Sequence, residues 1–240
     1  VAGAKVWKKD VPLYIDEIGT CAANESVKVQ AKVSGQIVSR NFKDGADVKK
    51  GDVLFTIDKR PYQAALDQAK ADDMLAQANL QRQEELKAKG VTASQDLDTA
   101  KANAMRTSAS MAAAQVNLDY CTIRSPLDGR TGLRQVDVGN TVSAGSGGAV
   151  LVQIDNLDPI YSDFTVAEPD LPLVRKYLNG PNLKVLTDAE NDGFAAQEGH
   201  LYFIANTVQP GTGTVQARAT TPNPTDQQWP SQLVHRRLVL

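Results

Sequence analysis

The sequence has few of the residues from which metal sites and catalytic centres are usually built. Its 240 residues include two cysteines and two histidines. Cys21 and Cys121 lack the short spacing of metal-binding cysteines, and His200 and His235 show no triad or metal-ligand spacing. The three methionines are scattered and form no soft-metal cluster. We therefore expect no metal, no cofactor and no enzyme activity.

The sequence also has no long apolar run and no large excess of charge of either sign. No run of 18 apolar residues exists, so no segment is predicted to span a membrane. The net charge of −2 gives no basic footprint for nucleic acid. Residues 1–10 have no apolar core, so we expect any signal or lipid anchor to lie outside this sequence. Ile18–Cys21 resembles a lipoprotein box only superficially, because Asp16 and Glu17 stand where apolar residues would be required.

Two segments on either side of residue 90 look like halves of one repeat. In each half a stretch of period-2 alternation, beginning at Val27 and at Cys121, is followed by three glycines with spacings of 10 and 6 residues. The glycines are Gly35, Gly45 and Gly51 in the first half, and Gly129, Gly139 and Gly145 in the second. The offset between the halves is 94 residues, with an insertion of about three residues near 146–149.

Alternation of period 2 predicts strands with one buried face, and glycines at matched positions predict turns. One half of about 35 residues buries too little apolar surface to fold alone. We therefore predict a small β-sandwich with pseudo-twofold symmetry, in which the two halves share one core.

The alanine-rich segment between the halves, 59–120, is predicted to form two antiparallel helices. The second helix carries a heptad seam with spacings that alternate between four and three residues. That seam comprises Ala93, Leu97, Ala100, Ala104, Thr107, Met111, Ala114 and Leu118. The first helix follows Pro61 and has a looser stripe, which Asp72 and Asp73 interrupt. The stripe comprises Ala65, Leu66, Ala69, Ala76, Leu80 and Leu86.

The turn between these helices is expected at Gly90, which can end the first helix, and Thr92 or Ser94 can cap the second. With roughly 27 residues per helix, the hairpin would be ~40 Å long. Such a hairpin has little core of its own, so self-association or docking is a hypothesis. The alternative is a hairpin folded back on the β domain, but its polar outer faces favour projection.

The residues after Asp155 are predicted to form a second β region. Strands are expected at Ile160–Val166, Gly199–Asn206, Thr214–Thr220 and Gln232–Leu240, with Asp10–Cys21 as a further strand. A short helix is expected at Glu168–Asn179. About six strands and one helix suggest a small barrel.

Several motifs resemble the periplasmic adaptor subunits of tripartite efflux pumps, also called membrane fusion proteins. They are Val29–Ile37, Asp44–Asp58, the hairpin and Ile123–Thr131. The segment Phe203–Thr214 with Arg218-Ala219 and Pro222-Asn223-Pro224 resembles the barrel of the resistance-nodulation-division (RND) branch. One departure is Trp229-Pro230-Ser231, where that family usually has Pro-Gly.

The resemblance implies a multidomain α+β fold. Its parts would be lipoyl-like sandwich halves at 24–58 and 121–156, an antiparallel coiled-coil hairpin at 59–120, and a β-barrel with one short helix at 157–240. Residues 1–23 would supply a strand to the barrel or to a membrane-proximal region. The membrane-proximal domain itself is expected to be mostly absent from this sequence.

The resemblance further implies a non-catalytic adaptor in the periplasm, associated with the inner membrane. It would link an RND transporter to a TolC-like outer-membrane channel, assemble as a trimeric or hexameric ring, and serve export of drugs or other small molecules. The tips of family hairpins carry an arginine, a leucine and a serine. Arg82 and Leu86 match the first two, whereas Ala93 occupies the third position between Thr92 and Ser94.

Two alternatives remain open at the level of the sequence. ATP-driven and heavy-metal exporters use adaptors with the same sandwich and hairpin. Lipoyl and biotinyl carrier subunits of enzymes share the sandwich, but they hold a modified lysine between the two halves. Here the helical segment occupies that place, and Lys59 precedes Arg60-Pro61 as a charge at the start of a helix.

Overall fold

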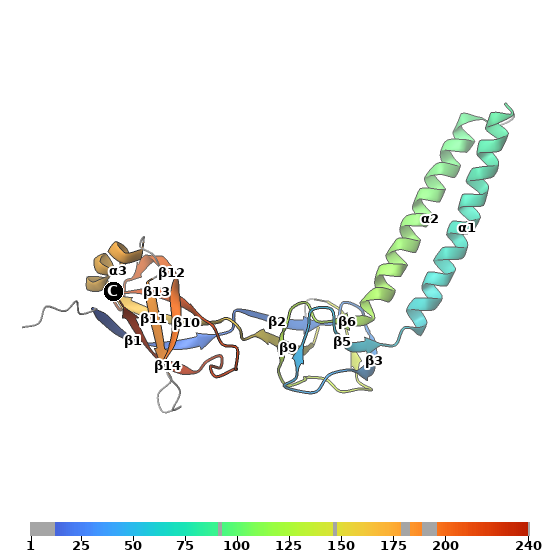
Figure 1. The fold of residues 1–240 in the computed structure, drawn as a ribbon. Helices are drawn as coiled ribbons and strands as arrows, with labels where there is room; N and C mark the ends of the chain where they lie inside the picture. Colours follow the sequence, from blue (N-terminus) through green and yellow to red (C-terminus); the bar gives the residue numbers. More distant parts are fainter. Residues whose placement is uncertain (1–12, 91–92, 146–147, 179–182, 189–195, 240) are drawn as a thin grey trace, which may run out of the picture. The chain divides into compact units, whose positions relative to one another are not determined.

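A computed structural model describes residues 13–90, 93–145, 148–178, 183–188 and 196–239. The chain divides into two units, Val27–Ile154 and the combination of Val1–Ser26 with Asp155–Leu240 (Figure 1). The first unit contains a β-sandwich and two long helices, and the second contains a β-barrel. The fold is thus a mixed α and β structure, and each unit is described by itself.

The sandwich consists of two four-stranded sheets, and each sheet takes strands from both halves of the repeat. The first has the order β2 (Glu25–Gln30), β9 (Val150–Asn156), β7 (Gly129–Thr131) and β4 (Asp47–Val48). The second has the order β6 (Thr122–Arg124), β5 (Val53–Ile57), β3 (Gly35–Arg40) and β8 (Thr141–Val142). The repeat offset converts one order into the other, which agrees with the predicted pseudo-twofold symmetry.

The apolar core lies between these two sheets and follows the repeat. Ile57 and Ile154, which are matched positions, are both fully buried in the same cluster. Gly45 and Gly139 also match, with φ of 76° and 98°. Both glycines therefore adopt the left-handed conformation that side chains disfavour. The halves bury their apolar residues in each other, as expected for segments too short to fold alone.

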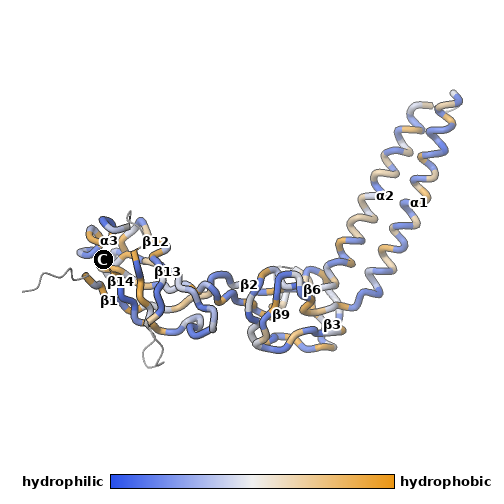
Figure 2. The backbone as a smooth tube through the Cα atoms, in the orientation of Figure 1, coloured by the Kyte–Doolittle hydropathy of each residue, from blue (hydrophilic) through white to orange (hydrophobic). Residues whose placement is uncertain are grey.

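Two helices of nearly equal length connect the halves, α1 (Arg60–Ala88) and α2 (Ser94–Tyr120), and they pack side by side (Figure 1). The predicted seam on α2 is buried or half-buried at every position from Leu97 to Leu118, whereas Ala93 is exposed. At the base of the helices, the Tyr62 hydroxyl donates a hydrogen bond to the Ser34 carbonyl at 2.6 Å. Figure 2 shows hydrophilic residues at intervals along both helices, more of them on α1 than on α2.

The seam on α1 differs from its prediction. Most of its covered residues repeat with alternating spacings of four and three, and Asp73 occupies one of these positions instead of interrupting the row. These positions are Tyr62, Leu66, Ala69, Asp73, Ala76, Leu80 and Gln83, and Asn79 and the predicted Leu86 are half-buried as well. Ala65, which the sequence placed in the stripe, is exposed. The reason is a partner across the seam, because the Thr107 hydroxyl lies 3.0 Å from Asp73 Oδ1.

The second unit contains a closed antiparallel barrel of six strands. Their order is β1 (Tyr14–Ala22), β10 (Ile160–Ala167), β13 (Thr214–Thr221), β12 (Gln197–Gln209), β11 (Lys184–Asp188) and β14 (Leu233–Val239), with β14 pairing back onto β1. The 3₁₀ turn η1 (Glu168–Asp170) and helix α3 (Leu171–Leu178) follow β10. The sequence interpretation did not name β11.

The barrel interior is filled by the inward positions of its strands. Phe164 and Val166 of β10, Ala217 and Ala219 of β13 and Leu238 of β14 belong to one buried cluster. None of the helices within the described ranges combines the length and apolar character needed to cross a bilayer.

The first prediction concerns the polar pair in the helix seam. Thr107→Val removes the donor that faces Asp73 and leaves the carboxylate without it, so we expect it to lower the free energy of unfolding by about 1 kcal/mol. Asp73→Leu combined with Thr107→Val replaces both polar groups by apolar ones, so we expect most of the loss to be recovered. Urea unfolding followed by circular dichroism at 222 nm measures both.

Thr99→Val is the matched control for this cycle. Thr99 is exposed on α2, and its hydroxyl donates to the Gln95 carbonyl at 2.8 Å, four residues earlier in the helix. Thr107 has the same type of contact with the Asn103 carbonyl, at 3.1 Å. If Thr99→Val cost as much as Thr107→Val, the loss would come from the helix backbone contact and not from Asp73.

A second prediction follows from Ser231, which lies between β13 and β14 and has φ of 68°. A side chain is unfavourable in this left-handed conformation, whereas glycine adopts it freely. Ser231→Gly should therefore raise the free energy of unfolding by about 1 kcal/mol. Thermal unfolding measures the gain. Ser231→Ala keeps the Cβ atom and removes only the hydroxyl, so a gain of equal size in that variant would contradict the explanation.

Candidate interface at the tip of the hairpin

The hairpin turns at the end of α1, where the helix closes in the way the sequence predicts. Lys89 is the C-terminal cap, and its backbone N–H donates to the Glu85 carbonyl at 3.2 Å. Gly90 follows with φ of 72°, and its N–H donates to the Lys87 carbonyl at 3.0 Å. The left-handed glycine stops the helix and reverses the chain.

The start of α2 differs from the prediction that Ser94 or Thr92 caps it. The helix begins at Ser94 itself, and the cap position belongs to Ala93, whose backbone is extended with φ of −72° and ψ of 151°. Alanine has no side-chain acceptor, so no side-chain hydrogen bond caps the helix. Thr92 lies outside the described residues. Asp96 is in the first turn, where its negative charge is favourable for the helix dipole.

A direct contact joins the two helix ends at the tip. The Lys87 ammonium group donates to the Ser94 hydroxyl at 2.5 Å, so Ser94 binds a side chain of α1 instead of its own helix. The sequence interpretation missed Lys87. Its position in the last turn of α1 was the available signal, because basic residues favour the negative end of the helix dipole.

Arg82 and Leu86 lie on one face of α1, because residues four apart are neighbours on a helix. Arg82 is exposed, and its Nη1 donates to Asn79 Oδ1 at 3.1 Å. Leu86 is half-buried. The pair therefore presents a cation beside a partly covered apolar side chain.

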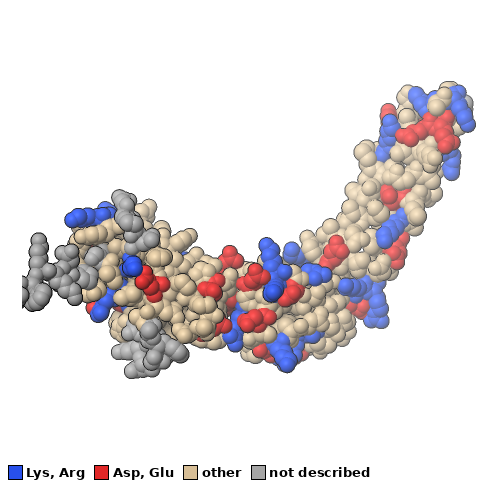
Figure 3. Space-filling view, viewed as in Figure 1, with Lys and Arg blue, Asp and Glu red and all other residues tan. Residues whose placement is uncertain are grey.

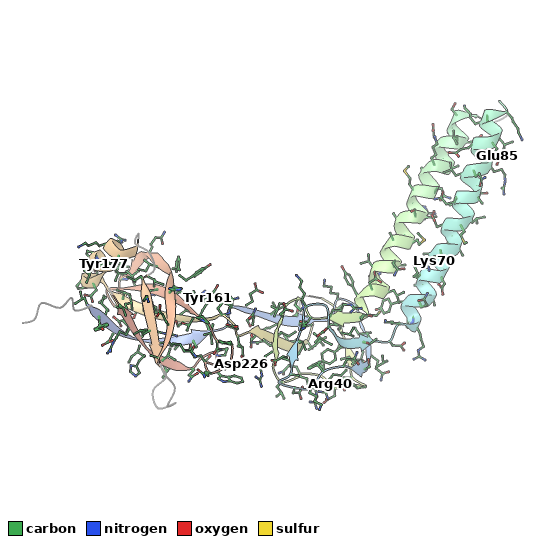
Figure 4. All side chains as sticks on the ribbon, in the orientation of Figure 1. Arg40, Lys70, Glu85, Tyr161, Tyr177 and Asp226 are labelled. Atoms are coloured by element: carbon green, nitrogen blue, oxygen red, sulfur yellow. The ribbon has the colours of Figure 1, made fainter. Side chains whose placement is uncertain are left out.

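The surface around these residues is charged with both signs (Figure 3). Figure 4 labels Glu85 near the end of α1 and Lys70 farther toward its base. The predicted seam residues lie elsewhere: Ala104 is buried, and Leu97, Ala100, Met111 and Leu118 are half-buried against α1. The tip residues Arg82 and Ser94 are exposed, in contrast to these covered positions.

The base of the hairpin has its own contacts. The Arg60 guanidinium binds the Asp58 carboxylate through two side-chain nitrogens at 2.6–3.1 Å. These hydrogen bonds, with one from the Arg60 backbone, lower the pKa of Asp58 to about 2. Lys59 is the N-cap of α1, and its carbonyl accepts a hydrogen bond from the Gln63 N–H at 2.8 Å. The lysine is thus part of the helix start and not the tip of a β-hairpin.

A groove of about 540 Å³ lies beside this base, between the edge strands β2 and β6. Val29 and Ile123 contribute apolar surface to it, and Lys32 lies over the Tyr120 ring with Nζ 4.8 Å from the centroid. Across the described part of the chain, no three His, Cys, Asp or Glu side chains gather in a way that could hold a metal ion.

The chain is similar to curated proteins over nearly its whole length. It is 36% identical over 248 residues to the multidrug resistance protein MdtA of Proteus mirabilis, covering 96% of this chain and 60% of that protein. It is 34% identical over 255 residues to the MdtA of Escherichia coli K12, covering 100% of this chain and 61% of that protein. The chain thus spans about three fifths of the length of these relatives.

Solved structures share the fold at lower identity. A chimeric MacA-MexA protein containing the α-hairpin domain of Pseudomonas aeruginosa MexA superposes with a TM-score of 0.80 at 22% identity, covering 96% of this chain and 83% of that one. A putative efflux transporter from Bacteroides eggerthii gives a TM-score of 0.79 at 20% identity, covering 98% and 73%. At these identities the likeness concerns the fold alone.

Family models identify both β regions. The model for the barrel-sandwich hybrid domain of RND membrane fusion proteins (MFPs) matches residues 25–155, which include the hairpin. The model for the β-barrel domain of RND MFPs matches residues 159–240. Together with the relatives, these matches show that the chain belongs to the RND family of membrane fusion proteins.

Proposed function

We propose that this chain is the core of a non-catalytic periplasmic adaptor of an RND efflux pump. The complete protein would associate with the inner membrane and join an RND transporter to a TolC-like outer-membrane channel. Two relatives that align with almost all of this chain are named multidrug resistance proteins, which supports the export of drugs or similar small molecules.

The observation that carries the proposal is the hairpin. Helix α1 has 29 residues, which corresponds to a length of ~43 Å. The seam between α1 and α2 is narrow, and most other positions along both helices are exposed. A long exposed helical pair with a charged turn is suited to contact a partner far from the sheets that hold it. We propose that it forms a coiled coil whose tip docks on the channel.

The proposal assigns one role to each segment. Residues 24–58 and 121–156 form the lipoyl-like domain that holds the hairpin 59–120, and residues 157–240 with the strand in 1–23 form the barrel. The exposed alanines and polar residues of the helices would be covered by neighbouring copies in a trimeric or hexameric ring. Partner and ring contacts would thus stabilise surface that a single hairpin leaves open.

The other functions considered from the sequence have less support. A carrier subunit requires an accessible lysine at a β-hairpin tip, whereas Lys59 is the N-cap of α1. An adaptor for an ATP-driven or heavy-metal exporter would share the sandwich and the hairpin. The match of residues 159–240 to the RND barrel favours an RND transporter instead.

A crosslinking experiment tests the docking of the tip. A cysteine introduced as Ser94→Cys, carrying a photoreactive maleimide, should crosslink to the outer-membrane channel in intact cells. Ser110→Cys is the matched control: it is exposed on the same helix and lies 16 residues away, or ~24 Å along its axis. The native cysteines are buried and should not react. Equal crosslinking at both positions, or crosslinking at Ser110→Cys alone, would contradict docking through the tip.

A charge reversal tests the role of Arg82. Arg82→Glu should weaken docking to the channel about tenfold or more, because an interface arginine commonly contributes 1–2 kcal/mol or more. The measurement is drug accumulation in cells that depend on this adaptor, together with pull-down of the channel. We expect accumulation to rise and pull-down to fall.

Arg106→Glu provides the control for this variant. Arg106 is exposed on α2 and donates to the Asn103 side chain at 2.9 Å, three residues earlier, as Arg82 does to Asn79. Both variants lose the same type of hydrogen bond and change the net charge equally. If Arg106→Glu reduced efflux as strongly as Arg82→Glu, the effect would be one of general charge and not of the tip.

A further inference from the structure

The barrel interior contains a charged side chain that lacks a counter-charge. Arg236 of β14 is 1% exposed. Its Nε and Nη1 have no hydrogen-bond partner within the described parts of the chain. Its Nη2 lies 3.8 Å from Cys21 Sγ, and a thiol is a weak acceptor. Buried arginines are otherwise paired, because burying an isolated charge is costly.

Loss of the proton does not relieve this cost near neutral pH. Burial lowers the pKa of Arg236 to about 10. That value is still far above pH 7, so nearly every guanidinium group keeps its charge. The charge must therefore be compensated by something other than deprotonation.

The closest acidic residue in register does not provide the compensation. Glu17 of β1 is the Cα partner of Arg236 across the sheet. The pKa of Glu17 is raised by burial and by the Asp170 carboxylate, whereas a guanidinium neighbour would lower it. The Arg236 side chain instead passes Gly19, where an added Cβ would lie 3.5 Å from Arg236 Cγ, and reaches Cys21. It thus extends away from Glu17.

The two other arginines on the described barrel strands, Arg237 of β14 and Arg218 of β13, have carboxylate partners. Arg237 binds Asp16 through two nitrogens at 2.6 and 3.0 Å, and Arg218 binds Asp163 at 2.6 and 2.8 Å. Arg236 alternates with Arg237 on β14 and points to the opposite face. It therefore lies inside the barrel, away from both pairs.

The side chains near Arg236 are hydroxyl, thiol and amide groups. Thr187 is its Cα partner on β11, and the Thr187 hydroxyl lies 3.3 Å from that of Thr221. Cys21 Sγ donates to Gln228 Oε1 at 3.7 Å. The described buried polar side chains of this unit include no carboxylate. A fixed positive charge with no carboxylate among the described buried side chains favours an anion over a cation.

Residues 222–232, which connect β13 to β14, close this end of the barrel. The Cys21 N–H donates to the Gln232 carbonyl at 2.9 Å, and the Ser231 N–H donates to the Cys21 carbonyl at 2.8 Å. Asn223 is fully buried, and its side-chain nitrogen donates to the Gln228 carbonyl at 2.9 Å. Figure 4 labels Asp226 in this connection. These contacts shield the guanidinium from bulk solvent, in agreement with the 1% exposure of Arg236.

We propose that the closed end of the barrel binds a small inorganic anion of about the size of chloride, held by Nε and Nη1 of Arg236. The anion supplies the counter-charge and accepts hydrogen bonds from the N–H groups of Nε and Nη1, which have no other partner in the described parts of the chain. Binding to the folded barrel alone stabilises it by mass action, so the stability of the barrel depends on the anion present.

Bromide and chloride are the probes for this site. Crystals of the chain grown or soaked with sodium bromide should show an anomalous peak within hydrogen-bonding distance of Arg236 Nε and Nη1. In solution, sodium chloride should raise the midpoint of thermal unfolding by about 4 °C or more relative to sodium gluconate at equal ionic strength. Gluconate is too large for a closed site and serves as the reference anion.

Two methionine variants separate this site from general salt effects. Arg236→Met should abolish the difference between chloride and gluconate, whereas Arg237→Met, one residue away on the exposed face, should retain it. If Arg236→Met does not fold, the bromide peak and the salt comparison with the unsubstituted chain decide the question. No peak would show that water satisfies the guanidinium. A peak without any chloride dependence of unfolding would show anion binding at crystal concentration only, and either result would overturn the proposal.

Discussion

The pairing of β5 with β6 is the constraint on which the hairpin depends. β5 ends the first half of the repeat and β6 begins the second, and the Ile57 N–H donates to the Cys121 carbonyl at 2.8 Å. The segment between these residues must therefore leave the sheet and return to it at adjacent points. Two antiparallel helices of 29 and 27 residues satisfy this requirement. The sandwich thus fixes the base of the hairpin before the helices contribute any contact of their own.

This arrangement explains how a weak helix pair can persist. The seam residues buried on α2 are Ala104 and Thr107, and on α1 they are Leu66, Ala69 and Ala76. These side chains bury little apolar area, so the helices gain little free energy from each other. Holding both ends in one sheet lowers the entropy lost on pairing, because the helices are already neighbours. The surfaces that remain exposed are then available for a partner.

The sequence predicted those parts of the structure that periodic patterns determine. The matched glycines and strands identified the sandwich, because two segments with the same pattern are expected to adopt the same backbone conformation. The positions that the sequence assigned to the α2 seam are buried or half-buried from Leu97 to Leu118. Their regular spacing was the signal, because residue type alone does not mark a buried face: Met74, Leu75 and Met105 are exposed on the same helices. Asp73 was misread as an interruption, because its burial depends on Thr107 of the other helix. Such a cross-helix hydrogen bond leaves no trace in the period of either helix alone.

Local end effects and the barrel were harder to predict for a related reason. Ser94 has the chemistry of a helix cap, but Lys87 of α1 binds its hydroxyl, and Ala93 takes the cap position. β11 has only five residues, too few for its alternation to stand out. In the sequence, Arg236 is one of two adjacent basic residues, Arg236-Arg237, and nothing there indicates that it is buried. Only the pairing of β14 with β1 places its side chain in the barrel interior. In each case the outcome depends on a residue distant in the sequence.

The unfavourable features of the barrel are concentrated at one end. Ser231 and Asp226 adopt left-handed backbone conformations with φ of 68° and 51°, and Arg236 is buried a few residues later. The described part of the sandwich has no comparable unfavourable features. Its left-handed residues are all glycines, and its buried polar side chains are uncharged. Left-handed backbone at two residues that are not glycine costs roughly 1–2 kcal/mol each, so the surrounding contacts must hold this segment in place. The hydrogen bonds between Cys21 and residues 231–232, and the one from Asn223 to Gln228 within the connection, provide such contacts. Changes at this end should therefore affect the stability of the barrel more than equivalent changes on its outer walls.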